Sequence, residues 1–152
     1  MLIHSTRFGD IDVPAEQILQ FPHGIPGFPA EKVFAYLVRD KKSPFSFLQS
    51  ASDPNLTFLL AEPFTFFNDY EFALDDGIAQ EMGLSEENPP QIFTMATLKG
   101  KLEDMTVNLL APLVINTKER TGRQIILDRS QYSTRQKLFP NGLPQQAAKG
   151  GK

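Results

Sequence analysis

The chain lacks several residue types, and each absence limits its chemistry. Its 152 residues contain no cysteine and no tryptophan, and only two histidines, His4 and His23. Without cysteine there are no disulfides, thiolate metal ligands or thiol nucleophiles. The two histidines show neither the HxH nor the HExxH spacing of a metal site. We therefore expect no metal, no cofactor and no catalytic residues of these kinds.

Long apolar runs are also missing. No segment approaches the ~20 apolar residues of a membrane span, and the N-terminus lacks the apolar core of a signal peptide. The length suits one domain, and the 13 phenylalanines suffice for one core. We expect a soluble, cytoplasmic protein, not bound to a membrane, in which residues 1–139 form a single domain. The tail, residues 140–152, has little to bury and is predicted to be disordered.

Basic residues are absent from a long central stretch. Between Lys42 and Lys99 there is no lysine or arginine, whereas residues 99–152 hold ten basic and four acidic residues. A one-signed run of this length sets up a field that favours basic partners. For any single carboxylate, however, the simpler explanation is that it lies on a solvated outer face and binds no partner. The nine carboxylates of the central stretch are Asp53, Glu62, Asp69, Glu71, Asp75, Asp76, Glu81, Glu86 and Glu87.

Aromatic residues concentrate in the same stretch. Residues 63–72 read Pro-Phe-Thr-Phe-Phe-Asn-Asp-Tyr-Glu-Phe, with four Phe and one Tyr among polar groups. Most Phe rings are buried for packing, but rings beside carboxylates can also anchor in a partner's pocket. Because no base compensates the charge, the segment as a whole favours a recognition surface.

Short runs of β-forming residues between turns indicate the fold class. One helix is predicted over residues 77–82, capped by Asp75 or Asp76 and ended by Gly83. Gly122 is expected to take a positive φ in a hairpin turn. The pattern predicts a mainly β chain, a small antiparallel β-barrel-like domain with one short helix. Strands are predicted over residues 2–7, 45–49, 57–61, 93–98, 106–110, 113–116 and 123–127.

Two patterns leave other functions open. Asp69 and Glu71 could form the acid–base pair of a small carboxylate-dependent enzyme, since residues two apart share a strand face at not far from the ~5–5.5 Å that retaining glycosidases need. The basic run over residues 120–137 could contact phosphates and stack a base on Tyr132, as in an RNA-binding module. A strand pair with a charged outer face is the simpler interpretation, and a net charge of −3 argues against nucleic acid.

Two asparagines bracket the apolar run over residues 109–115. The amides of Asn108 and Asn116 either close strand ends within the chain or hydrogen-bond a partner's backbone. The sequence does not decide between these two roles.

Read in order, several segments resemble the FliW family of bacterial flagellar assembly factors. Together they cover about residues 3–138. They are Thr6-Arg-Phe-Gly9, Phe21-Pro-x-Gly-Ile-Pro-Gly-Phe28, Pro44-Phe-x-Phe-Leu-Gln-Ser50, Asp53-Pro54, Pro63-Phe-x-Phe-Phe-x-Asp-Tyr-Glu-Phe72, Met105-Thr-Val-Asn-Leu-Leu-Ala-Pro-Leu-Val-Ile-Asn116, Gly122-Arg-Gln124 and Tyr132-Ser-Thr-Arg135.

The resemblance implies a small β-barrel-like protein that is not an enzyme and does not bind nucleic acid directly. Members of this family bind flagellin and CsrA, a dimeric RNA-binding protein that represses flagellin translation. Newly made flagellin would occupy the factor and leave CsrA free to repress. Export of flagellin would release the factor to sequester CsrA, so the protein would act as a chaperone and a translation regulator. We expect the chain to be monomeric when free.

The acidic stretch suggests where CsrA would bind. A protein that binds RNA presents cationic surface, to which a negative patch is complementary. From the charge pattern, and not from the resemblance, we predict the partner-binding residues. They are Asp53, Asn55, Asp69, Tyr70 and Glu71.

Overall fold

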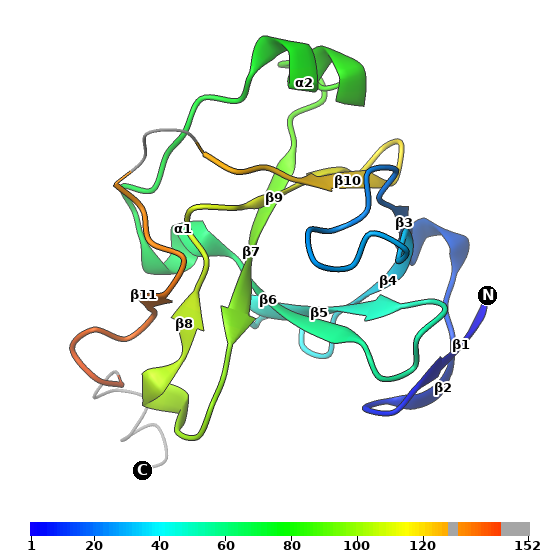
Figure 1. Ribbon diagram of the computed structural model, residues 1–152, viewed down its shortest axis with the longest axis horizontal. Coiled ribbons are helices and arrows are strands. Elements are labelled where there is room, and N and C mark those ends of the chain that lie inside the picture. The colour runs from blue at the N-terminus through cyan, green and yellow to red at the C-terminus, as the bar shows by residue number, and fades with distance from the viewer. Residues whose placement is uncertain (128–130, 144–152) are drawn as a thin grey trace.

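The computed structural model describes residues 1–127 and 131–143 of the chain (Figure 1). Strands account for most of its regular structure. The strands are β1 (Leu2–Ser5), β2 (Gly9–Asp12), β3 (Ile18–Gln20), β4 (Val33–Leu37), β5 (Phe45–Ser50), β6 (Thr57–Ala61), β7 (Gln91–Thr97), β8 (Thr106–Val107), β9 (Leu113–Asn116), β10 (Thr121–Gln124) and β11 (Gln136–Lys137). The helices are α1 (Pro63–Phe66) and α2 (Asp76–Met82), with two 3₁₀ turns, η1 (Ala15–Gln17) and η2 (Leu102–Asp104).

Seven strands close into a barrel, which confirms the predicted mainly β fold. They follow the order β7-β6-β5-β4-β3-β10-β9, and β9 pairs back with β7 to complete the ring (Figure 1). Six of these seven pairings are antiparallel. The seventh, between β3 and β10, is parallel and rests on the single pair Gln20 and Thr121. The barrel therefore has one short seam, which the sequence did not reveal.

The core fills this barrel with apolar side chains from every part of the chain. Phe21, Phe34 and Leu48 are fully buried, and Phe21 meets Phe34 edge to face at 5.5 Å between ring centroids. All four residues of β9 are buried, and β9 pairs with β10 on one edge and with β7 on the other. Burial of this kind contributes roughly 1.5–3 kcal/mol for each large side chain.

The β9–β10 hairpin forms as predicted, but its turn uses a different residue. The positive φ of 59° belongs to Arg120, and Gly122 lies within strand β10. Gly122 is needed for space: a Cβ atom there would lie 2.6 Å from Cζ of Phe21 and 2.8 Å from Cδ1 of Ile115. The prediction for Gly122 was wrong. Glycine is selected both by turns that need a positive φ and by positions where other side chains approach the backbone closely, and the sequence alone does not distinguish the two.

Two helices lie outside the barrel, where one was predicted. In α2, Asp75 caps the N-terminus by accepting from the N–H groups of Gly77 and Ile78, and Gly83 ends the helix at φ 75°. These features confirm the predicted caps. The additional helix, α1, is one turn that begins at Pro63, a position where the fixed φ of proline suits a helix start.

The two chain ends join the barrel differently. Strands β1 and β2 form a separate hairpin, held to the barrel by Ser5, whose Oγ donates to Oε1 of Gln49 at 2.7 Å. Near the other end, β11 pairs with β8 beside β7. Of the predicted disordered tail, residues 140–143 are described and include a turn in which the Gly142 N–H donates to the Phe139 carbonyl. Residues 144–152 lie outside the described part.

Candidate interaction surfaces

The acidic central stretch forms the charged exterior of the molecule. Eight of its nine carboxylates are exposed, and Asp53 is half-buried. Within residues 1–127 and 131–143, only Glu81 among the nine takes part in an ion pair. Most of this negative charge is therefore free to attract a basic partner.

The five predicted site residues lie in two separate places. Asp53 and Asn55 belong to the turn that joins β5 to β6, whereas Asp69, Tyr70 and Glu71 follow α1, which begins beyond the opposite end of β6 (Figure 1). A five-residue strand spans about 16 Å. The structure therefore does not bring the two groups into one contact surface.

Asp53 and Asn55 stabilise their own turn. The Asn55 N–H donates to Oδ1 of Asp53 at 2.9 Å, and Nε2 of Gln49 donates to the Asp53 carbonyl at 3.2 Å. The Thr6 hydroxyl donates to Oδ1 of Asn55 at 2.5 Å. The bonds of Asp53 hold the β5–β6 turn, and the bond from Thr6 to Asn55 joins the N-terminal hairpin to that turn, so both residues have a structural role.

Tyr70 was predicted to bind a partner at the surface, but the structure buries it. Its side chain is only 3% exposed, and its hydroxyl donates to the Leu109 carbonyl at 2.7 Å. Its ring meets that of Tyr132 at 4.7 Å. Burial, with a smaller contribution from Tyr132, raises the pKa of the Tyr70 phenol above its usual range. Tyr70 therefore anchors the segment that carries its two acidic neighbours.

Asp69 and Glu71 are exposed on either side of this anchor. The Glu71 N–H donates to the Tyr132 hydroxyl at 3.0 Å, and that hydroxyl is 3.1 Å from the Glu71 carbonyl oxygen that accepts from it. The segment is a turn followed by irregular chain and not a strand. The strand-face spacing on which the acid–base interpretation depended is therefore not present.

A hollow of about 990 Å³ opens beside this segment. Its lining combines exposed carboxylates of the acidic stretch, called here the rim, with apolar side chains that are mostly half-buried, called here the floor. Among the apolar residues, Ile126 is 63% exposed. The rim residues are Asp69, Glu71 and Asp75, and the apolar lining comes from Phe72, Ile78, Ile125, Ile126 and Leu127. No lysine or arginine is among the described lining residues.

Sequence reasoning missed the apolar wall of this hollow. Residues 125–127 were predicted to continue the strand that begins at Arg123, yet β10 ends at Gln124. The available signal was the run Ile-Ile-Leu, since alternation along a strand sends its middle residue to the opposite face.

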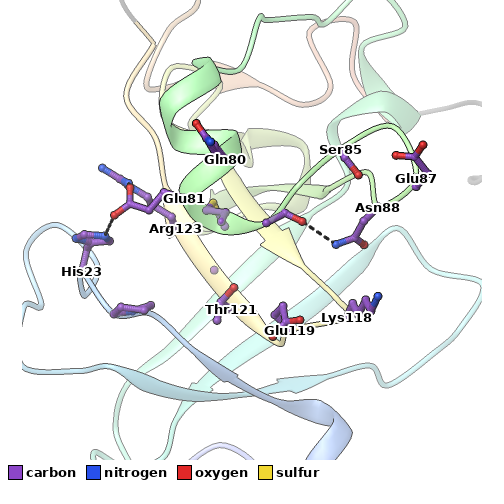
Figure 2. A pocket seen from close by; sticks show the side chains of 14 residues that line it. His23, Gln80, Glu81, Ser85, Glu87, Asn88, Lys118, Glu119, Thr121 and Arg123 are labelled. Carbon is purple, nitrogen blue, oxygen red and sulfur yellow. Dashed lines mark hydrogen bonds and ion pairs between the residues drawn. The ribbon is translucent and has the colours of Figure 1, made fainter.

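A second hollow, of about 650 Å³, lies between α2, the β9–β10 turn and His23 (Figure 2). Glu81 stands at its edge beside two basic side chains: its carboxylate is 3.0 Å from Nη1 of Arg123 and 3.7 Å from Nε2 of His23. His23 lies in the loop that follows β3, beside this carboxylate. The ion pair between Glu81 and Arg123 links α2 to the barrel, beside the parallel seam.

The two asparagines close local structure, the first of the roles considered for them. Asn116 is fully buried: its Nδ2 donates to the Met82 carbonyl at 2.6 Å, and its Oδ1 accepts from the Glu119 N–H at 3.0 Å. Asn88 also donates to that oxygen at 3.3 Å. Oδ1 of Asn108 accepts from two backbone N–H groups, at positions 110 and 111.

Two arginines of the basic run make contacts within the chain. Arg123 pairs with Glu81, and Nη1 of Arg120 donates to the Ala15 carbonyl at 3.0 Å. Tyr132, the residue considered for base stacking, packs on Tyr70 instead. Arg129 lies outside the described residues. These contacts favour the charged strand pair over an RNA-binding surface.

Metal binding and membrane insertion both depend on how the described residues are arranged. No group of three or more His, Asp or Glu side chains within them is placed to hold a metal ion. None of their helices is long and apolar enough to cross a membrane.

The closed barrel and the exposed carboxylates of the acidic stretch define a small β-barrel protein that presents negatively charged surface. Comparison with known proteins identifies the family. The sequence profile of the FliW protein family matches residues 2–138. The chain therefore belongs to the FliW family of flagellar assembly factors.

Individual relatives agree with this assignment. The chain is 57% identical over 151 residues to the flagellar assembly factor FliW of Desulfitobacterium hafniense (strain DSM 10664 / DCB-2), covering 99% of each chain. It is 38% identical over 135 residues to the FliW of Bacillus subtilis (strain 168), covering 89% of this chain and 94% of the other. A crystal structure of a flagellar assembly factor FliW superposes with a TM-score of 0.84 at 38% identity, covering 94% of this chain and all of that one.

Proposed function

We propose that this chain binds flagellin and the translational repressor CsrA as mutually exclusive partners in the cytoplasm. The observation that carries the proposal is the match to the FliW family over residues 2–138. When flagellin is abundant it occupies the factor, and free CsrA represses further flagellin synthesis. Export of flagellin frees the factor, which then sequesters CsrA and lets translation resume.

The charge of the exterior supports the CsrA half of this exchange. A messenger-RNA-binding protein needs cationic surface to neutralise phosphates. Asp69 and Glu71 are exposed and form no ion pair within residues 1–127 and 131–143, so they offer a complementary face, and Tyr70 between them is anchored in the fold. Such a face speeds association more than it raises affinity, because rim charges act over distance. Of the five residues first considered, we keep Asp69 and Glu71 as direct contacts.

Calorimetric titration tests the exchange. The chain is titrated with CsrA of the same organism, alone and after saturation with flagellin. We expect a 1:1 stoichiometry per chain without flagellin and no heat of binding with it. Light scattering of the free protein checks that the starting state is a monomer.

Two outcomes would contradict the proposal. Undiminished CsrA binding to the flagellin-saturated chain would exclude mutually exclusive partners. Absence of binding to either protein would remove the partner-exchange mechanism from this chain altogether.

A further inference from the structure

The hollow with the acidic rim contains an unused strand edge. Beyond β10, residues 125–127 continue its ladder: the Ile125 N–H donates to the Pro112 carbonyl and the Leu127 N–H to the Leu110 carbonyl, both at 2.9 Å. These pairs keep the register of β10, in which Gln124 faces Leu113. The segment is thus extended and bonded along one edge.

Ile126 lies between the two bonded residues and presents the other edge. In an antiparallel ladder, alternate residues direct their N–H and C=O groups to opposite sides. Within residues 1–127 and 131–143, no hydrogen bond reaches the backbone of Ile126, and its side chain is 63% exposed. β3, the strand beside β10 on this edge, pairs only at Thr121. An open edge of this kind is a template for an added strand.

The surroundings of this edge select the chemistry of the added strand. Ile125, Leu127 and Ile78 line the hollow with apolar surface, which favours apolar side chains from the occupant. The rim carries Asp69 and Glu71 with no cation among the described lining residues, which favours Lys or Arg. Side chains of a strand alternate between two faces, so one extended segment can meet both demands.

We propose that residues 125–127 bind an extended segment of a partner protein by strand addition, with basic and apolar residues alternating in that segment. This inference rests on the proposed function, because it takes the added strand from one of the chain's protein partners. A helical occupant would satisfy its own backbone and leave the Ile126 N–H and C=O unpaired. A strand pairs both groups and seats its apolar side chains on the floor of the hollow.

Amide hydrogen exchange tests the pairing directly. The probe is a capped hexapeptide of alternating lysine and isoleucine, added to the intact chain at millimolar concentration. We expect exchange at the Ile126 N–H to slow by about tenfold or more, because that N–H becomes hydrogen-bonded. A capped hexapeptide of the same length and alternation, with glutamate in place of lysine, is the charge control and should leave exchange unchanged.

Two substitutions at Ile126 distinguish the contribution of its backbone N–H to peptide binding from that of its side chain. Ile126→Pro removes the N–H donor and should weaken binding of the lysine peptide by about tenfold. Ile126→Val keeps the donor and most of the side chain, and should bind within about twofold of the parent. Because the exchange measurement uses the unsubstituted chain, the inference stays testable even if the proline variant fails to fold.

The same exchange measurement with flagellin and with CsrA separates this inference from the proposed function. If the partners bind but neither they nor the peptide protect the Ile126 N–H, strand addition is overturned while partner exchange stands. If neither partner binds but the peptide protects it, the edge is confirmed and the proposed function fails.

Other occupants give distinct results in the free protein. Protection of the Ile126 N–H that rises with protein concentration would show a second copy on the edge. Protection that disappears when residues 144–152 are deleted would show the chain's own tail there. Either result would overturn the assignment to a partner segment.

Discussion

Gly122 lies so close to the core that substituting it tests quantitatively how tightly the barrel is packed where it closes. A Cβ at this position would lie 2.6 Å from Cζ and 2.7 Å from Cε2 of Phe21, and 2.8 Å from Cδ1 of Ile115. Phe21 is fully buried against Phe34 and cannot swing away without moving it. Forcing a methyl group into such packing typically costs about 1–3 kcal/mol.

Gly122→Ala should therefore lower the free energy of unfolding by about 2 kcal/mol. The smaller entropy of the unfolded alanine chain offsets this by about 0.4–1 kcal/mol, so the steric cost itself is nearer the top of its range. Urea denaturation followed by tyrosine fluorescence measures the change. Because the strain is specific to Phe21, repeating the substitution in a Phe21→Leu background should cost at least about 1 kcal/mol less.

A neutral or stabilising Gly122→Ala would refute this reasoning, as would an equal cost in both backgrounds. The first result would mean that the seam can open to admit a methyl group. The second would mean that the cost arises in the backbone of β10 and not against Phe21.

Further predictions concern buried polar groups and the acidic face. Asn116→Ala should cost about 3 kcal/mol in urea denaturation, since it leaves the Met82 carbonyl and other buried groups unpaired; Asn108→Ala, half-buried, should cost less than half as much. Tyr70→Phe should cost about 1–2 kcal/mol by losing the bond to the Leu109 carbonyl. Because the pKa of Tyr70 is raised in the fold, its contribution is complete below the ordinary tyrosine value of 10.0 and is lost as the pH rises further; stability of the phenylalanine variant should fall less in that alkaline range. Asp69→Lys should slow CsrA association several-fold at low salt, whereas Glu103→Lys, a reversal at an exposed site outside the acidic stretch, should change it little in stopped-flow measurements.

Local signals predicted some elements well. β6 and β9 were predicted with their observed bounds, since short aromatic or aliphatic runs between turns are typical of strands. The caps of α2 were readable because an aspartate before a helix and a glycine after it act through adjacent backbone groups. Strand β4, by contrast, was missed although it lies in the barrel wall.

The candidate site shows the limit of such signals. Exposure of Asp69 and Glu71 follows from their charge, and the structure agrees. The burial of Tyr70 does not follow, because it depends on Leu109 and Tyr132, which are distant in the chain. Charge alone also grouped Asp53 with Asp69, although strand β6 separates them.

By itself, the sequence determined the β class, the unbalanced negative charge and the family, because each depends on residue type and order along the chain. Only the tertiary structure decided which residues meet. The parallel seam that brings Gln20 beside Thr121, the space that Gly122 must leave, and the open edge at Ile126 all arise from contacts between distant segments. No local preference specifies such contacts, because the free energy of closing the barrel is shared among all seven of its strands.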